Sequence, residues 1–232
     1  MEELSILVVD DEVEIANLVE IHLVSEGYKV FKANNAATGL NLLAKNDIQL
    51  AIIDIMMPGM DGITMVKKIR ENSNIPIIML SAKSSDLDKI VGLGSGADDY
   101  VAKPFNPLEL TARVKSALRR YTQLNTKTES GSANEVRVQN LTMNRNTHAV
   151  VAYGKDIVLT PTEFDIIYML ASNPGRVFST EEIFENVWGE KMFESNNTVM
   201  VHIRRIRGKI ELDAKNPQII KTVWGVGYKI EK

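Results

Sequence analysis

Between residues 4 and 121, short apolar runs alternate with segments whose apolar residues recur at helical spacing, and this alternation restricts the fold more than any other feature of the chain. It predicts an α/β domain whose parallel strands are joined by right-handed helical crossovers and covered by helices on both faces. The expected strands are Ile6–Val9, Lys29–Ala33, Leu50–Ile53, Ile75–Leu80 and Tyr100–Ala102. Sheets of this kind bind ligands at the carboxyl ends of their strands, so the residues at these ends locate a candidate site.

Four of the five strand ends carry a charged or hydroxyl side chain. Asp10 and Asp11 follow the first strand, Asp54 the third, Ser81 the fourth and Lys103 the fifth. Taken singly, each has a structural explanation, because an Asp after a strand commonly caps a helix and a Lys-Pro pair commonly ends a strand. Gathered at one edge, the carboxylates would repel one another unless a cation joined them, and their hard oxygen atoms suit Mg²⁺ or Mn²⁺.

This set of side chains suits phosphoryl transfer. A carboxylate beside a bound metal, with a lysine and a hydroxyl nearby, is equipped to accept a phosphoryl group as an acyl phosphate. Asp54 would be the phosphoacceptor. Asp11, Asp54 and a backbone carbonyl near Met56 would hold the metal. Lys103 would neutralise phosphate oxygens, and Ser81 would hydrogen-bond one of them.

The segment 122–134 (TQLNTKTESGSAN) lacks apolar periodicity and is rich in Thr, Ser and Asn, which predicts a flexible linker. It separates two expected domains, 1–121 and 135–232. The formal net charge of −3 would argue against a nucleic-acid partner if the charges were spread evenly. They are not, because residues 196–209 contain no carboxylate and several cations: Arg204, Arg205, Arg207 and Lys209.

The second domain is expected to combine short β-like pieces with three helices. The β-like pieces and the final Gly-rich hairpin are Val136–Val138, His148–Ala152, Ile157–Leu159 and Thr222–Ile230. Capping-box patterns at Thr160 and Ser179 predict the starts of two helices, and Thr198–Glu211 has the periodicity of a third. Three helices followed by a hairpin are typical of a helix-turn-helix variant with a β-wing.

The third helix has one narrow apolar stripe, formed by Val199, Ile203, Ile206 and Ile210. At about 100° per residue, the opposite side carries Asn197, Val201, Arg204, Arg205 and Gly208, flanked by His202, Arg207 and Lys209. A helix with cations on its exposed side fits the major groove of DNA, where arginine bonds guanine edges and any cation bonds phosphates. A solvated amphipathic helix would explain these cations alone, and the preceding helices and hairpin favour DNA.

The N-terminal half resembles the receiver domain of bacterial response regulators. The motifs that carry the resemblance are VVDDE (8–12), DIMMPGMDG (54–62), MLSAK (79–83) and ADDYVAKPF (97–105). It spans residues 1–121 and implies a flavodoxin-like sheet of strand order 2-1-3-4-5. It also implies that a cognate sensor histidine kinase phosphorylates Asp54.

The receiver resemblance assigns further roles. Asp10 and Asp11 would form the acidic metal pocket, Ser81 and Tyr100 would act as the switch pair, and the Lys103-Pro104 bond would be cis. After phosphorylation, a homodimer would form through helix four, strand five and helix five, on a face that carries Lys89, Asp98, Asp99, Glu109 and Arg113. Lys89–Glu109 and Asp99–Arg113 would pair across this dimer. A solvated surface is the alternative explanation of these charges.

Residues 135–232 resemble the winged-helix effector domain of the OmpR/PhoB subfamily, through the segments LTPTEFDIIYMLASNPGRVFS, TVMVHIRRIRGKI and KTVWGVGYKI. The resemblance implies binding to promoter DNA and regulation of transcription. Its DNA-facing residues would be Asn197 and Arg205 near bases, His202, Arg204, Lys221 and Lys229 at phosphates, and Val201 on the same side. The wing would lie near the minor groove. Trp224 stands where other members have an arginine before the wing glycine, so insertion of a guanidinium is not expected.

Several function classes remain to be separated. The segments SNNTVMVHIRRIR and KTVWGVGYKIEK look similar to those of glycopeptide-resistance regulators, which implies such genes as targets, and the loop 190–195 could contact RNA polymerase. The alternatives are an effector domain that binds protein, and an orphan regulator that binds DNA without phosphorylation.

An enzyme is not expected, because Asp54 could turn over only its own phosphate. No targeting or membrane segment is predicted, which favours a cytoplasmic protein, and the absence of Cys excludes thiol chemistry.

Overall fold

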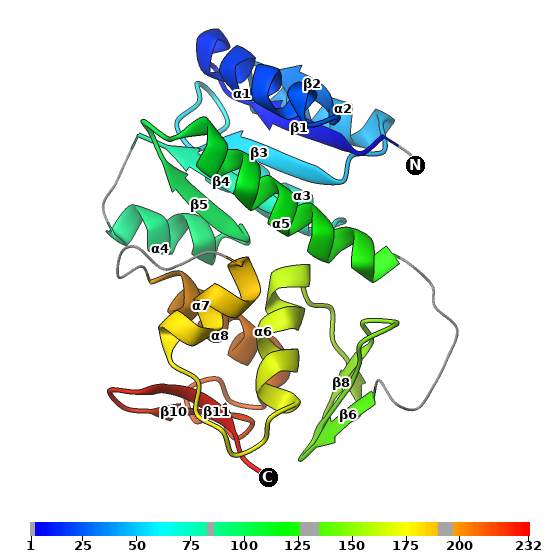
Figure 1. The fold of residues 1–232 in the computed structure, drawn as a ribbon, viewed down its shortest axis with the longest axis vertical. Coiled ribbons are helices and arrows are strands. Elements are labelled where there is room, and N and C mark those ends of the chain that lie inside the picture. The colour runs from blue at the N-terminus through cyan, green and yellow to red at the C-terminus, as the bar shows by residue number, and fades with distance from the viewer. Residues whose placement is uncertain (1–2, 83–85, 126–134, 190–196) are drawn as a thin grey trace. The chain divides into compact units, whose positions relative to one another are not determined.

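The computed structural model of the chain describes residues 3–82, 86–125, 135–189 and 197–232, with the side chains of 86–89 and 123–125 left out. Figure 1 shows its two compact units, Met1–Tyr121 and Thr122–Lys232. In this described part of the chain, no helix is both long and apolar enough to cross a lipid bilayer.

The first unit is built on five parallel strands in the order β2-β1-β3-β4-β5, which confirms the expected sheet. The strands are β1 (Ser5–Val9), β2 (Lys29–Ala33), β3 (Leu50–Asp54), β4 (Ile77–Ser81) and β5 (Asp99–Ala102). The side chains of β1, β3 and β4 are buried throughout, which explains why these strands are uninterrupted apolar runs in the sequence. Val9 lies beside Ile53, and Asp54 beside Leu80, so the carboxyl ends of β1, β3 and β4 form one edge.

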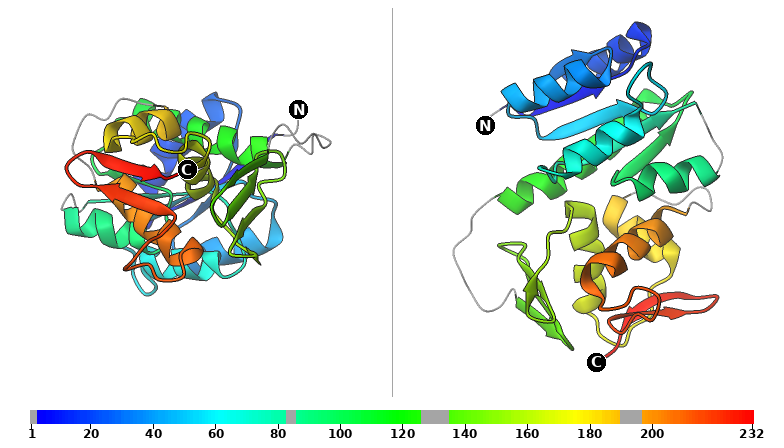
Figure 2. Two further views of the ribbon diagram at one scale, coloured as in Figure 1. Left: turned by 90° about the horizontal axis from the view of Figure 1, so that it is seen from below. Right: turned by 180° about the vertical axis from the view of Figure 1, so that it is seen from behind.

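Helices cover both faces of this sheet. Figures 1 and 2 show α1 (Val13–Ser25) and α5 (Pro107–Asn125) on one face, and α2 (Ala36–Lys45), α3 (Gly62–Arg70) and α4 (Asp86–Gly94) on the other. Apolar side chains of α1 and α5 form one continuous core with residues of the central strands. The helices thereby fix the sheet from both sides and leave its carboxyl edge for polar residues.

The second unit places three helices between two antiparallel sheets. The first sheet contains β6 (Glu135–Val138), β7 (Leu141–Asn144), β8 (Val150–Ala152) and β9 (Lys155–Asp156). The helices are α6 (Pro161–Ala171), α7 (Thr180–Trp188) and α8 (Thr198–Ile210), and the final hairpin pairs β10 (Ile220–Val223) with β11 (Gly227–Ile230). Complete capping boxes at Thr160 and Ser179 confirm the predicted starts of α6 and α7.

The predicted strands of the second unit need correction. The sequence prediction omitted β7, in which only Leu141 and Met143 point into the core, because two apolar positions are too few for a clear alternation. It also placed a strand at Ile157–Leu159, where the structure has none. Only the Ile157 N–H continues the ladder, by donating to the Val150 carbonyl, and the chain then turns into the cap of α6.

His148 lies in the connection between β7 and β8, half-buried against the ring of Phe164 at a centroid distance of 4.1 Å. Burial, together with the charge of Arg145, lowers the pKa of His148 to about 4 from its ordinary value of 6.5. Because folding depresses this pKa, protonation favours the unfolded chain. The second unit should therefore lose stability as the pH falls from 6.5 towards 4, by up to about 3 kcal/mol from this group.

We expect His148→Asn to flatten the pH dependence of stability over this range, because asparagine does not titrate and tolerates the positive φ of 52° at this position. Both tryptophans of the chain, Trp188 and Trp224, lie in the second unit, so urea unfolding followed by tryptophan fluorescence reports on that unit. The matched control is His22→Asn in α1 of the first unit. An equally steep loss of stability in the His148 variant would contradict the prediction.

Candidate phosphoacceptor site and nucleic-acid interface

The carboxyl edge of the parallel sheet brings Asp10, Asp54 and Lys103 together. The Lys103 ammonium lies 2.8 Å from an oxygen of Asp10 and 2.8 Å from an oxygen of Asp54. Both carboxylates are buried, with 1% and 3% of their residue surface exposed. Two carboxylates in so little solvent need a counter-charge, and the lysine supplies it. The structure therefore brings together three residues that the sequence predicted to meet at this edge.

Backbone groups fix the direction of the two carboxylates. Asp54 Oδ2 accepts a hydrogen bond from the Met56 N–H at 2.6 Å, and Asp10 Oδ1 accepts one from the Glu12 N–H at 3.0 Å. The loop after β3 then folds back on itself at Gly62, whose N–H donates to the Ile55 carbonyl at 3.0 Å. A Cβ at this glycine would lie 2.1 Å from the Asp54 carbonyl oxygen, so only glycine permits the approach.

The protonation states follow from these contacts. Burial alone would lower the pKa of Lys103, but its hydrogen bonds and charge interactions with Asp10 and Asp54 outweigh burial and raise that pKa above its usual value. The pKa of Asp10 is raised, because burial outweighs the opposing effect of Lys103. The lysine is therefore a permanent cation between the two acids.

The other predicted residues surround this core of the site. Ser81 is fully buried at the end of β4, and its carbonyl accepts the Lys103 N–H at 2.6 Å. Tyr100 is also buried, whereas Asp11 and Met56 are exposed. The Lys103-Pro104 bond is cis, which confirms the expectation.

One contact of the site was not predicted. The Glu12 carboxylate lies 3.1 Å from the Lys103 ammonium, although its own side chain is 61% exposed. The signal was present in the sequence, because Glu12 completes the acidic run after the first strand.

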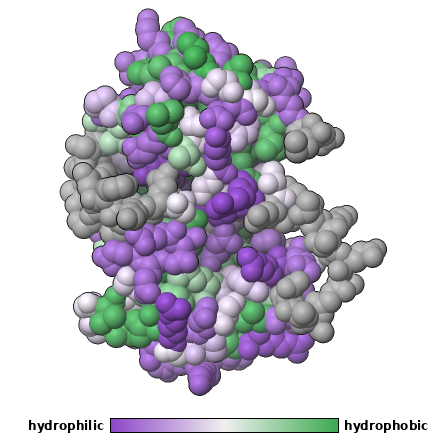
Figure 3. Space-filling model, viewed as in Figure 1, coloured by the Kyte–Doolittle hydropathy of each residue, from purple (hydrophilic) through white to green (hydrophobic). Residues whose placement is uncertain are grey.

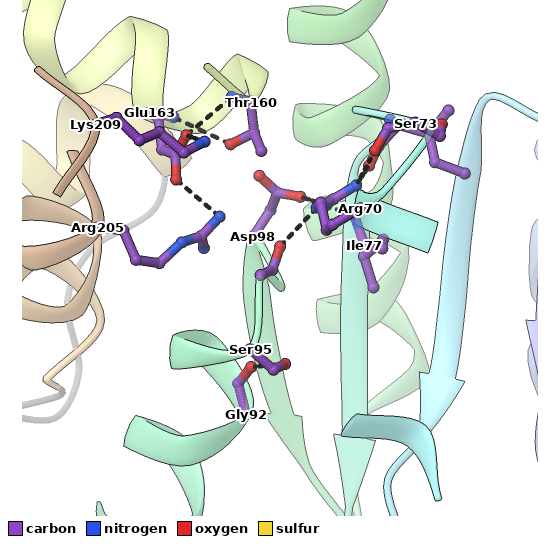
Figure 4. Close-up of polar contacts among 12 residues, drawn as sticks. Arg70, Ser73, Ile77, Gly92, Ser95, Asp98, Thr160, Glu163, Arg205 and Lys209 are labelled. Atoms are coloured by element: carbon purple, nitrogen blue, oxygen red, sulfur yellow. Dashed lines mark hydrogen bonds and ion pairs between the residues drawn. The ribbon is translucent and has the colours of Figure 1, made fainter. Parts of the chain in front are cut away.

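The proposed dimer face has its charges paired within one chain. Arg113 of α5 contacts Asp99 at 2.9 Å and Glu109 at 2.8 Å. The sequence prediction placed Asp98 on this dimer face, and the structure corrects it. Asp98 is 1% exposed and forms an ion pair with Arg70 of α3 at 2.7 Å (Figure 4). It supports the interior of the unit instead of its surface. The side chain of Lys89 lies outside the described residues.

In the second unit, one buried carboxylate binds two cations of α8. Glu163 of α6 lies 2.8 Å from Arg205 and 2.6 Å from Lys209, as Figure 4 shows. The same carboxylate accepts the Thr160 N–H in the capping box of α6 at 3.0 Å. Charge interactions with Arg205 and Lys209 hold the pKa of Glu163 below its usual value despite burial. Glu163 thus fixes α8 against α6.

These contacts change the predicted DNA-facing side of α8. Arg205, expected near bases, has only 13% of its side chain exposed and pairs with Glu163. His202, expected at a phosphate, is buried beside the indole of Trp188 at a centroid distance of 5.4 Å, because it flanks the apolar stripe. Val201 is also buried. Arg204 is exposed, as predicted, and Asn197 is partly exposed at the start of the helix.

The two predicted lysines of the wing lie directly opposite each other, Lys221 on β10 and Lys229 on β11. Lys221 donates to the Pro217 carbonyl at 2.9 Å, and Lys229 forms an ion pair with Glu231 at 2.9 Å. Both are partly exposed. The loop 190–195, expected to contact RNA polymerase, lies outside the described residues.

Comparison with known proteins identifies both halves of the chain. Residues 6–115 match the family model described as response regulator receiver domain, and residues 154–230 match the one described as transcriptional regulatory protein, C terminal. The chain is 51% identical to the regulatory protein VanR of Enterococcus faecium and 48% identical to the regulatory protein VanRc of Enterococcus gallinarum, over 98% of each chain. It is similar to the crystal structure of DrrB, an OmpR/PhoB homolog from Thermotoga maritima, at 32% identity and a TM-score of 0.53 over the full length of both chains.

Proposed function

The chain belongs to the response regulators that join a receiver domain to an OmpR/PhoB-type DNA-binding domain, and from this premise we propose that phosphorylation of Asp54 by a sensor histidine kinase controls its binding to promoter DNA. As a member of this family it is a two-component transcription regulator and not an enzyme. The observation that carries the proposal is the buried Asp54 carboxylate, held by Lys103 and the Met56 N–H beside Ser81. A phosphoryl group there would find a cation, a backbone donor and a hydroxyl.

A divalent cation fits the same edge. The oxygens of Asp10 and Asp54 already attract one cation, Lys103, and carboxylates are the hard ligands that Mg²⁺ or Mn²⁺ prefer. Among the described residues, no group of three or more acidic, His or Cys side chains is arranged to hold a metal ion, so the exposed Asp11 and the backbone near Met56 would complete the set. When bound, the metal would neutralise charge on the transferred phosphoryl group.

The proposed switch begins at Ser81 and ends at the α4–β5–α5 face. A phosphoryl group at Asp54 would draw the Ser81 hydroxyl towards it and leave space for Tyr100 to move. The Tyr100 ring packs close to α4, since a Cβ at Gly92 would lie 3.3 Å from it. Movement of this ring would therefore displace α4.

The homodimer is proposed to form on this same face. In one chain, Arg113 already pairs with Asp99 and Glu109, which shows that these charges are complementary. In a two-fold symmetric dimer, each could exchange its partner for the equivalent residue of the second copy. Asp98 takes no part in this interface, because it is buried with Arg70.

Promoter DNA is proposed to contact α8 through Arg204 and the wing through Lys221 and Lys229. Arg204 stands on the exposed side of α8. The other Arg and Lys side chains of this helix are held within the unit: Arg205 and Lys209 by Glu163, and Arg207 by the Ile220 carbonyl and the Thr222 hydroxyl. Operator DNA recovered by selection from random sequence would test the proposal. It would also test the expected glycopeptide-resistance targets.

We expect Arg204→Ala to weaken binding to the selected DNA about tenfold at moderate salt, and to reduce the slope of log K against log salt by about one, because one phosphate contact is lost. Sequence preference should stay the same. The matched control is Lys155→Ala, which removes an exposed cation from β9 of the same unit. Unchanged affinity and salt dependence in the Arg204 variant would contradict this contact.

A further inference from the structure

The charged residues of the second unit differ in how far they are withdrawn from water. Hydrophilic side chains cover much of the visible surface of this unit in Figure 3, and charges in that position are hydrated. The Glu163 carboxylate of α6 is the opposite case, because it is 0% exposed. A carboxylate without solvent has to be compensated by cations, so Glu163 must engage positive side chains of its own unit.

Glu163 engages one cation of α8 with each of its oxygens. Its Oε1 lies 2.8 Å from the Arg205 guanidinium, and its Oε2 lies 2.6 Å from the Lys209 ammonium (Figure 4). Arg205 and Lys209 are four residues apart, so they stand on the same side of the helix. These contacts leave 13% of the Arg205 side chain and 35% of the Lys209 side chain exposed.

The neighbouring arginine of α8 is in a different electrostatic state. Arg204 lies about 100° around the helix from Arg205 and is exposed, so it presents its charge to the solvent. Arg205 and Lys209 share one negative charge that the solvent does not reach. A helix that carries no carboxylate of its own is therefore partly neutralised by a carboxylate of α6.

A DNA phosphate is a poor replacement for this carboxylate. A contact between a cation and a phosphate forms at a wet surface, where the release of counterions gives about tenfold in affinity. Leaving Glu163 buried without its cations would cost more than one such contact returns. The acid cannot follow its cations, since it accepts the Thr160 N–H at 3.0 Å in the capping box of α6. Arg205 and Lys209 therefore stay with Glu163 when DNA approaches α8.

We propose that Glu163 is a positioning residue that withholds Arg205 and Lys209 from DNA phosphates and so limits the sequence-independent part of DNA binding. The inference rests on the proposed function, since it requires that α8 binds DNA. Contacts with phosphates carry no sequence information and raise the affinity for any duplex. Keeping two cations of α8 out of such contacts leaves a larger share of the affinity to contacts with bases.

Replacing Glu163 by glutamine tests the proposal, because glutamine serves at this position of a capping box and only the charge is lost. Arg205 and Lys209 are then released to bind phosphates. We expect Glu163→Gln to bind a random-sequence duplex about tenfold more tightly at moderate salt, with a slope of log K against log salt that is steeper by about one to two. Replacing a residue that only supports the fold would weaken binding instead.

Fluorescence anisotropy of labelled DNA measures both quantities on the full-length protein over a range of salt concentrations. The matched control is Glu135→Gln in β6, which removes a carboxylate paired with the exposed Arg137 and changes the net charge by the same amount. This control should leave the slope unchanged. A triple variant that combines Glu163→Gln, Arg205→Gln and Lys209→Gln should return to the wild-type affinity and slope, because the two cations make no phosphate contact in the wild type. Tryptophan fluorescence checks that each variant is folded in the second unit.

A second experiment needs no variant and decides the question even where a substitution prevents folding. Reductive methylation followed by mass spectrometry measures the reactivity of each lysine in the wild type, with and without the random duplex. Lys209 should react slowly in the free protein, because its ammonium is bound to Glu163, and DNA should not change its rate. Lys221 and Lys229 of the wing should be protected by DNA, and Lys155 of β9 should not. Protection of Lys209 by DNA would overturn the proposal.

The outcomes separate this inference from the proposed function. If folded Glu163→Gln binds random DNA no more tightly than the wild type, Glu163 only supports the fold, and DNA binding by α8 stands. If the folded triple variant binds more weakly than the wild type, Arg205 or Lys209 contacts DNA in the wild type, and the proposal is overturned. If the wild type binds neither random nor selected DNA, both the inference and the proposed function are wrong.

Discussion

Replacing Asp54 by asparagine is expected to abolish the incorporation of phosphate from a small phosphodonor in the presence of Mg²⁺. The amide keeps an oxygen that can accept the Met56 N–H, so the local structure should survive. It cannot act as a carboxylate nucleophile, and the loss should therefore be complete. Intact-protein mass spectrometry measures the result directly, as the addition of one phosphoryl group per chain.

The matched control for this experiment is Asp61→Asn. Asp61 lies in the same loop, where its carboxylate accepts the Thr64 N–H at 2.7 Å as the N-cap of α3, and asparagine is an equally good cap. The control should accept one phosphoryl group, as the wild type does. Phosphate incorporation into the Asp54 variant at the wild-type level would place the phosphoacceptor elsewhere.

Replacing Arg70 by methionine is expected to destabilise the first unit by about 3–5 kcal/mol, the cost of breaking a buried ion pair by removing one partner. The Arg70 guanidinium contacts Asp98 and donates to the carbonyls of Gly96, Ser73 and Ile75 (Figure 4). Asp98 also accepts the Ile77 N–H at 2.9 Å, so this pair ties α3 to the starts of β4 and β5.

Urea unfolding measures this loss. Far-ultraviolet circular dichroism reports on both units, whereas tryptophan fluorescence reports on the second unit alone. The transition of the first unit should shift to lower urea concentration while the fluorescence transition keeps its midpoint. Lys68→Met on the exposed side of the same helix is the control, and it should cost less than about 0.5 kcal/mol. An equally small shift for the Arg70 variant would show that the ion pair contributes little.

The candidate phosphoacceptor site was largely predictable because its residues stand at strand ends. Parallel strands with both faces covered are continuous apolar runs, so the positions of Asp54, Ser81 and Lys103 can be located without knowledge of contacts. Glu12 was missed as a partner of Lys103, since the two are 91 residues apart and the distance between them depends on the fold.

The ion-pair partners of charged residues on helices and at strand starts were harder to predict. Two residues that are adjacent in the sequence can contact different parts of the folded chain. Asp98 and Asp99 are adjacent, yet one is buried with Arg70 and the other pairs with Arg113. Arg204 and Arg205 are also adjacent, and periodicity placed both on the exposed side of α8. Glu163, on another helix, binds only the second of them.

The division of the α8 cations into those proposed to bind DNA and those that support the fold follows from such pairs. A buried carboxylate in α6 requires cations, and α8 supplies them from the side of the helix that faces it. Arg207 is used in the same way to hold the wing. The cations that remain for the proposed DNA contact are therefore fewer than the composition of the helix indicates.

Control of DNA binding by Asp54 phosphorylation is tested most directly by one comparison. The affinity of the wild-type protein for selected DNA with two half-sites is measured before and after treatment with a phosphodonor and Mg²⁺, with Asp54→Asn treated in parallel. We expect the phosphorylated wild type to bind at least about tenfold more tightly, the range in which coupling between sites normally falls, and the variant to show no change. Equal affinity before and after confirmed phosphorylation would contradict the proposal that phosphorylation of Asp54 regulates DNA binding. It would indicate an orphan regulator that binds DNA without phosphate.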